Sequence, residues 1–205
     1  MARASGSAPL AGGAGKGVWE GARVLYKFSR PRTMLGTFAG VLSTSLLAWV
    51  PEAGGTVAAA VATAQALVAA LLMNVAIVGV NQVYDVEIDR INKPYLPLAS
   101  GEMSMAGAVR TVVVTAALSL AMGVASLSLP LLATLGGSLA LGLAYSTDLP
   151  GLRWKRSPAV AAACIMAVRS FAVHVGFFAH VRLAQGLEFA WTPALGFAVA
   201  FMLLF

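Results

Sequence analysis

The sequence predicts an all-α fold, a polytopic helical membrane protein. Hydrophobic residues make up 59% of the 205 residues and charged residues only 11%, and the mean hydropathy is +0.83. Apolar runs of roughly 18 or more residues recur, and each is long enough to cross a bilayer as a helix. The net charge of +6 does not indicate nucleic acid binding, because the basic residues flank these runs, where they set topology and meet anionic headgroups.

The N-terminal 20 residues differ in composition from the rest. They are rich in Ala, Gly and Ser and have no acid before Glu20, which is typical of a disordered tail or of a transit-peptide remnant. We therefore place the folded domain at residues 21–205. Tyr26 and Phe28 accompany the basic residues that end at Arg32, and this mixture predicts an interfacial segment with aromatic anchors.

Six membrane helices are expected, the sixth incomplete. The expected spans are 33–50, 57–84, 105–127, 130–147, 157–181 and a segment from about 193 to 205. Pro94 and Pro97 predict the end of the second helix, because proline lacks a backbone N–H and restricts the residue before it. Residues 90–103 are therefore expected to form an irregular polar loop.

Basic residues alternate between the two sides of these helices. The N-terminal segment and the loops 90–103 and 148–157 hold most of them: Arg23, Lys27, Arg30, Arg32, Arg90, Lys93, Arg153, Lys155 and Arg156. The intervening loops hold a single one, Arg182. This distribution follows the positive-inside rule and predicts that the basic segments all face one compartment, where they can build one site together.

The stretch 81–102 holds four of the eight acidic residues. On one continuous helix, Asn81, Asp85 and Asp89 drift by only about 80° and share a face, whereas Glu87 lies about 200° from Asp85. Two carboxylates and an amide suit Mg²⁺, which takes one or two carboxylates with water and substrate phosphate. The alternative is a group of charges that reach from a helix end to the interface, but a carboxylate pair beneath an apolar helix is costly unless it serves an ion or substrate.

The same residues carry a family resemblance. The pattern N-Q-x-x-D-x-x-x-D at 81–89, followed by Asn-Lys-Pro-Tyr-Leu-Pro-Leu-Ala-Ser-Gly at 92–101, resembles the first aspartate-rich motif of the UbiA superfamily of intramembrane prenyltransferases. The second part is similar to the plastid homogentisate prenyltransferase branch. Tyr145, followed by Lys155 and Arg156, resembles the family's tyrosine and basic pair between the fourth and fifth helices.

The resemblance implies transfer of a prenyl group, expected to be phytyl, from an allylic prenyl diphosphate to homogentisate. This reaction belongs to tocopherol (vitamin E) and prenylquinone biosynthesis, in a plastid membrane with Mg²⁺ as cofactor. Metal and cations would neutralise the departing diphosphate, and apolar helices would exclude water from the reacting carbon. The implied metal-binding and catalytic residues are Asn81, Asp85, Asp89 and Tyr145. The implied diphosphate-binding residues are Lys93, Arg153, Lys155 and Arg156.

Two polar residues, Arg169 and His174, lie far from the ends of the fifth span. An unpaired arginine near the bilayer centre costs at least about 2.5–3.5 kcal/mol, so Arg169 is expected to face a polar cavity. It would bind the acceptor carboxylate or the diphosphate. His174 is either a second acceptor-binding residue, acting as a base, or a hydrogen-bonded packing residue.

One departure from the family bears on completeness. The family has a second aspartate-rich motif after its sixth helix, but the only acids beyond Glu102 are Asp148 and Glu188. We therefore expect a partial UbiA-like bundle, truncated after about five and a half helices and inactive as a fragment. Alternatives are a homogentisate solanesyltransferase or another aromatic prenyltransferase and, from a different class, a non-catalytic membrane protein or a transporter.

Overall fold

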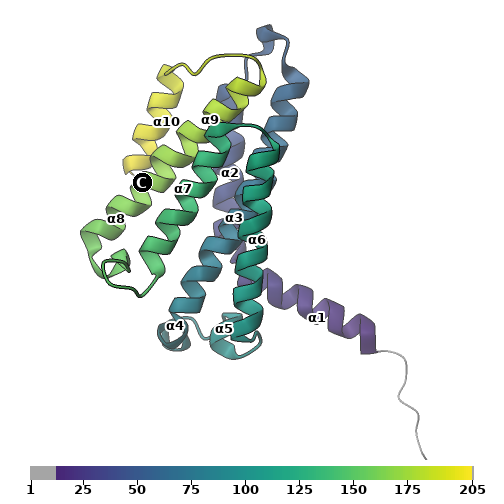
Figure 1. The fold of residues 1–205 in the computed structure, drawn as a ribbon, viewed down its shortest axis with the longest axis vertical. Helices are drawn as coiled ribbons and strands as arrows, with labels where there is room; N and C mark the ends of the chain where they lie inside the picture. Colours follow the sequence, from purple (N-terminus) through teal and green to yellow (C-terminus); the bar gives the residue numbers. More distant parts are fainter. Residues whose placement is uncertain (1–12, 205) are drawn as a thin grey trace, which may run out of the picture.

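The computed structural model describes residues 13–204, which form helices joined by short loops, with no strand in that range (Figure 1). The longer helices are α1 (Gly13–Phe28), α2 (Pro31–Ala48), α3 (Thr56–Tyr84), α6 (Met105–Ala125), α7 (Leu129–Ser146), α8 (Pro158–Met166), α9 (Val173–Ala184) and α10 (Pro193–Leu204). The shorter ones are α4 (Val86–Asn92) and α5 (Pro97–Ser100), with 3₁₀ turns at Pro51–Ala53 and Trp154–Arg156. The all-α prediction is confirmed.

Helix α3 is central and packs against α2, α6, α7 and α9. Its buried face is built largely from alanines, including Ala66, Ala69 and Ala76. Small side chains allow neighbouring helices to approach closely, which is how membrane helices associate without a hydrophobic driving force. Leu131 and Leu135 of α7 complete this core.

Four helical segments are long and apolar enough to cross a membrane: Thr56–Tyr84, Met105–Ala125, Leu129–Ser146 and Pro158–Ala184. Helix α2 lies beside them in the bundle but contains Arg32 and several hydroxyl residues, which lower its hydropathy. Helix α10 is apolar and has 12 residues up to Leu204. The chain is therefore a multi-pass membrane protein.

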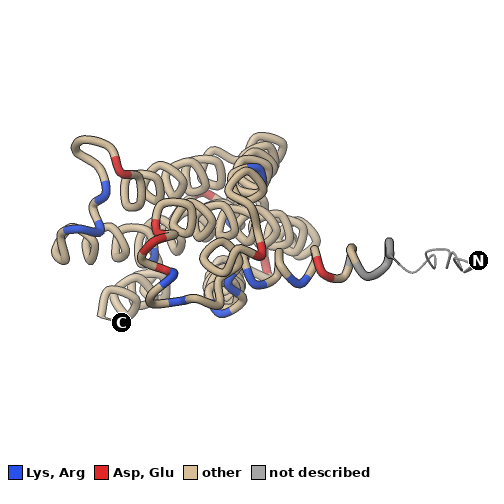
Figure 2. Tube along the Cα trace, turned by 90° about the horizontal axis from the view of Figure 1, so that it is seen from below, with Lys and Arg blue, Asp and Glu red and all other residues tan. Residues whose placement is uncertain are grey.

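The segments that hold most of the basic residues gather at one end of the bundle. Helices α4 and α5 and the loop between α7 and α8 gather at one end of the bundle, with the end of α1 beside them (Figure 1), and Figure 2 shows basic and acidic residues side by side at this end. The turns α2–α3, α6–α7 and α9–α10 lie at the other end. We call the first end the basic end.

Several details differ from the expectations. Residues 13–20 belong to α1, a helix that runs away from the bundle (Figure 1), while the rest of the expected tail, 1–12, lies outside the described residues. The loop 90–103 is not irregular throughout, because α4 extends to Asn92 and Pro97 begins α5. Proline fits the first turn of a helix, where its missing N–H would have no partner.

The fifth span is helical, but its middle part, Ala167–Ala172, is a π-helix between α8 and α9. In a π-helical segment each backbone hydrogen bond spans one more residue than in an α-helix, and such segments occur often at functional sites. Arg169 lies within this segment.

Candidate functional site

The aspartate motif does not lie on one continuous helix. Helix α3 ends at Tyr84, and Asp85 has φ −113° and ψ 15° before α4 begins at Val86. The single stripe expected for a continuous helix is therefore wrong in its geometry. Both aspartates are nevertheless buried, at 9% and 2% exposure for Asp85 and Asp89.

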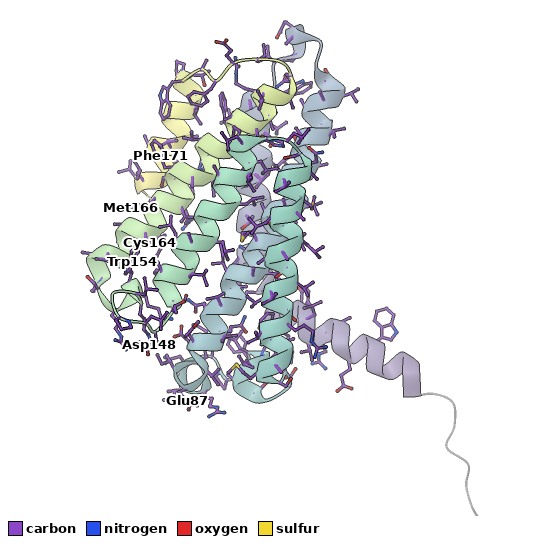
Figure 3. All side chains as sticks on the ribbon, in the orientation of Figure 1. Glu87, Asp148, Trp154, Cys164, Met166 and Phe171 are labelled. Carbon is purple, nitrogen blue, oxygen red and sulfur yellow. The ribbon has the colours of Figure 1, made fainter. Side chains whose placement is uncertain are left out.

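Glu87 behaves as expected and points away from these carboxylates. Its side chain is 82% exposed and pairs with Arg90 at 2.8 Å on the same short helix. Figure 3 shows Glu87 at the basic end of the bundle, on the outside of α4. The two aspartates and Glu87 thus separate into an inner pair and an outer residue.

Asp85 is held by cations from the loop after α7. Lys155 Nζ lies 2.6 Å from both of its carboxylate oxygens, and Arg153 Nη2 lies 3.7 Å from one of them. Arg153 has a left-handed backbone, with φ 59°, a conformation that costs a residue with a Cβ roughly 1–2 kcal/mol. Arg153 also pairs with Asp148. The two ion pairs of Arg153 hold its guanidinium in a buried position and fix the loop.

Asp89 is held by a different pair of cations. Lys93 Nζ donates to Oδ1 at 3.0 Å, and Arg30 Nη2 lies 3.6 Å from Oδ2. That Oδ2 atom is buried and accepts no hydrogen bond within the described residues. A buried carboxylate oxygen without a donor is an available ligand for a cation.

Sequence reasoning missed Arg30 as a site residue. Its backbone is left-handed, with φ 50°, at the elbow between α1 and α2. Gln82 fixes this elbow, because its Nε2 donates to the Phe28 carbonyl at 2.8 Å. The sequence signal was the basic run before Pro31, but only the fold brings Arg30 to Asp89.

Arg156 is not brought to the carboxylates. It pairs with Asp148 at 3.1 Å on the surface, and its side chain is 69% exposed. Asp148 lies in the loop after α7, at the same end as Glu87 (Figure 3). Of the four expected diphosphate-binding residues, Lys93, Arg153 and Lys155 therefore contact the motif aspartates, and Arg156 lies outside them.

A cavity of about 410 Å³ lies within the bundle. Arg30 lines it and also approaches Asp89, so this side chain connects the cavity with the carboxylate cluster, although neither aspartate lines the cavity. The other lining residues are apolar and polar in equal number. The polar ones include Asn74, Asn81, Ser138, Tyr145, Ser146 and Arg169.

Asn81 and Tyr145 both lie on this cavity, as the resemblance implies. Asn81 Nδ2 donates to Ser146 Oγ at 3.3 Å, which joins α3 to α7. Asn74 lies about two helical turns before Asn81 on α3. Its side chain forms hydrogen bonds with the hydroxyls of Thr37 and Thr33 on α2. Its contacts are those of a residue that joins two helices.

Arg169 and His174 have different positions. Arg169 lines the cavity, is exposed, and has no ion pair within residues 13–204. His174 is buried, does not line the cavity, and donates from Nδ1 to the Arg169 carbonyl at 2.9 Å. His174 therefore supports the π-helical segment and does not reach the space where an acceptor would bind.

The donor set suits a hard divalent ion bound together with phosphate. Within the described range, no group of three or more His, Cys, Asp or Glu side chains comes together as a metal cage. Mg²⁺ needs no such cage, since it is usually bound by one or two carboxylates plus substrate phosphates and water. Asp85 and Asp89, with the unbonded Oδ2, fit that requirement.

Comparison with known proteins agrees with this geometry. The model of the UbiA prenyltransferase family matches residues 41–205. The chain belongs to the UbiA prenyltransferase family. Prenyltransferases of the UbiA family generally use a divalent metal ion, which accords with the paired aspartates. No solved structure matches the chain.

Several curated proteins are similar to this UbiA family chain. Homogentisate geranylgeranyltransferase from Hordeum vulgare is 46% identical over 89% of this chain and 45% of its own length. Probable homogentisate phytyltransferase 1, chloroplastic, from Oryza sativa is 50% identical over 77% of this chain and 39% of its own length. Homogentisate phytyltransferase 1, chloroplastic, from Arabidopsis thaliana is 45% identical over 88% of this chain and 46% of its own length. The chain thus spans about half the length of these relatives.

Proposed function

We propose that the protein containing this chain transfers a phytyl or geranylgeranyl group from its diphosphate to homogentisate. One observation carries the proposal: two buried aspartates, each held by basic side chains, lie at one end of a membrane bundle, and Arg30, which approaches Asp89, also lines a partly apolar cavity inside that bundle. Transfer of a long apolar group from an anionic leaving group needs both parts. The similarity to homogentisate prenyltransferases supports the choice of substrates, and the chloroplastic relatives support a plastid membrane.

The basic residues would receive the diphosphate. Lys155 and Arg153 are bound to Asp85, and Lys93 and Arg30 to Asp89. Each can exchange its carboxylate partner for a phosphate oxygen, with arginine able to bind in bidentate fashion. The cations therefore stabilise the negative charge that develops as the carbon–oxygen bond of the donor breaks.

The aspartates would hold Mg²⁺ when the diphosphate binds, with Asn81 beside them as a neutral oxygen donor. The ion would supply Lewis-acid neutralisation of the leaving group. Asp89 is better suited than Asp85 to bind the ion, because one oxygen of Asp89 is buried and accepts no hydrogen bond from the described residues. Burial of both carboxylates keeps bulk water away from the reacting carbon.

The inner part of the cavity would take the acceptor. Arg169 is the cation that has no ion pair within the described residues and that lines this space from a membrane-spanning segment. A charge at that depth is costly unless it meets an opposite charge or water. A carboxylate on an aromatic acceptor supplies that charge, and Tyr145 lies on the same cavity wall to orient the ring.

Membranes that contain the full-length protein provide the test. They would be supplied with homogentisate, Mg²⁺ and, in separate reactions, phytyl, geranylgeranyl or solanesyl diphosphate. We expect a prenylated quinol from phytyl or geranylgeranyl diphosphate, and no product after chelation of the metal. Product from solanesyl diphosphate alone would replace the proposed donor, and no product from any donor would overturn the proposed function.

A further inference from the structure

A second cavity lies at the basic end, between the end of α1, the start of α2 and the loop after α4. It measures about 550 Å³, and Tyr26 and Tyr95 form its aromatic walls. Its charged lining residues are all basic: Lys27, Arg30, Arg32 and Lys93. A cavity lined by four cations and no acid is suited to an anion.

The carboxylates near these cations do not balance them. Lys27 pairs with Glu102 at 2.7 Å, while Arg30 and Lys93 share the single carboxylate of Asp89. Arg32 has no ion pair among the described residues. Four positive charges thus meet two negative ones, and the cavity keeps an excess of two.

The backbone adds to this excess. Helix α2 begins at Pro31 and has no acidic residue in its first turn. A helix N-terminus carries partial positive charge and favours an anion, so Arg32 is electrostatically unfavourable there unless an anion is bound. In addition, Arg30 Nη2 is buried and, although it lies 3.6 Å from Asp89 Oδ2, makes no hydrogen bond with the rest of residues 13–204. Both features indicate a missing acceptor.

We propose that this cavity binds the phosphate-bearing headgroup of an anionic membrane lipid. Tyr26 and Tyr95 are 64% and 68% exposed, and tyrosine is enriched at the level of the headgroups. Pro31 and Leu96 give the cavity an apolar side, where the glycerol part of a lipid fits and a free phosphate gains nothing. Basic pockets between membrane helices bind such headgroups.

Two of the four cations are shared with the candidate metal site. Arg30 and Lys93 line the lipid cavity and also hold Asp89. A headgroup competes with Asp89 for both side chains, which leaves that carboxylate freer to take a divalent ion, while Lys155 and Arg153 on Asp85 remain for the diphosphate. Lipid occupancy therefore raises metal affinity, and by reciprocity metal raises lipid affinity. This regulatory consequence rests on the proposed function, whereas the lipid binding does not.

The test uses the full-length protein in nanodiscs of phosphatidylcholine, with and without phosphatidylglycerol. Among the four cations that line this cavity, Arg32 is the one with no ion pair to a described residue, and Arg32→Gln removes it; Arg110→Gln is the matched control, because Arg110 is exposed near the start of α6 and lines neither cavity. Binding of a fluorescent phosphatidylglycerol should be about fivefold weaker in Arg32→Gln and unchanged in Arg110→Gln. Equal losses in both variants would mean diffuse surface charge and would overturn the proposal.

A second arm separates lipid from soluble anion. Inorganic phosphate, added to protein in pure phosphatidylcholine discs, should not raise the thermal unfolding midpoint, whereas phosphatidylglycerol should. An equal rise with inorganic phosphate would replace the lipid by a soluble anion. Finally, a Mn²⁺ titration followed by electron paramagnetic resonance should show tighter metal binding with phosphatidylglycerol in the unmodified protein but not in Arg32→Gln. If lipid binds without this difference, the coupling is wrong and the lipid site stands, whatever the enzyme assay shows.

Discussion

Replacement of Lys155 by methionine tests the ion pair that ties the loop after α7 to the end of α3. Lys155 Nζ lies 2.6 Å from both oxygens of Asp85, and the two side chains are only 15% and 11% exposed. Removal of one partner from a fully buried pair costs about 3–5 kcal/mol. Here Arg153 remains 3.7 Å from the same carboxylate and some solvent reaches it. We therefore expect a loss of about 2 kcal/mol in the free energy of unfolding.

Arg156→Met is the matched control, since Arg156 is in the same loop but its pair with Asp148 joins side chains that are 69% and 46% exposed. Such a surface pair contributes about 0–1 kcal/mol. Reversible unfolding in mixed micelles, with a denaturing detergent as titrant, measures both variants. A double-mutant cycle with Asp85→Asn should show strong coupling to Lys155→Met. Equal losses at the two basic residues, or additive losses in the cycle, would refute the structural role of this pair.

Three further substitutions test other contacts. Gly176→Ala would place a Cβ in steric overlap with the side chain of Thr134 in α7, whereas Gly136→Ala meets open space; the first should cost about 1–3 kcal/mol in the same unfolding assay and the second should not. The hydrogen bond from Lys27 lowers the pKa of Glu102 below the ordinary 4.5. The stability that the ionised carboxylate contributes to the folded protein is therefore present above pH 4.5 and is lost as the pH falls through the lower pKa of the folded state. The protection factors of the amides in α1, in which the intrinsic pH dependence of exchange is divided out, should decrease as the pH falls through this range. Glu102→Gln should remove that decrease; an equal decrease in both proteins would contradict this. His174→Phe removes the donor to the Arg169 carbonyl and should raise KM for the aromatic acceptor more than it lowers kcat. A loss confined to kcat would argue against this positioning role.

The sequence was sufficient to predict the membrane helices and the gathering of the basic residues at one end of the bundle. Long apolar runs and the one-sided distribution of basic residues each follow from the cost of burying polar groups in lipid, which is large and local in sequence. The outward position of Glu87 also followed from helical periodicity.

The details of the site depend on tertiary contacts that no local pattern contains. Periodicity assumes a continuous helix, but α3 ends at Tyr84, and Asp85 turns the chain toward Lys155, a residue 70 positions later. Arg30 joins the site only because the α1–α2 elbow has a left-handed residue that Gln82 supports from α3. These contacts join segments far apart in sequence, so single-sequence reasoning could name the charge types but not their pairs.

His174 shows the opposite limit. The sequence left both a base and a hydrogen-bonded packing role open for this histidine, and in the fold its ring donates to the backbone carbonyl of Arg169. The carbonyl of Arg169 belongs to a π-helical segment, in which each backbone hydrogen bond spans one more residue than in an α-helix. Amino-acid composition does not predict this change. The candidate acceptor-binding residue Arg169 and the residue that supports it can therefore be told apart only in three dimensions.

The central claim is that Asp85 and Asp89 serve the divalent metal and the diphosphate, while Glu87 does not. The most direct measurement is Mg²⁺-dependent prenyl transfer by the full-length protein with Asp89→Asn, compared with Glu87→Gln at equal membrane insertion. We expect a loss of about 10²-fold or more for Asp89→Asn, the scale of removing one group that stabilises developing charge. Glu87→Gln should keep its activity, because that side chain is 82% exposed and faces away from the cavity. Equal losses in the two variants, or full activity in Asp89→Asn, would contradict the claim.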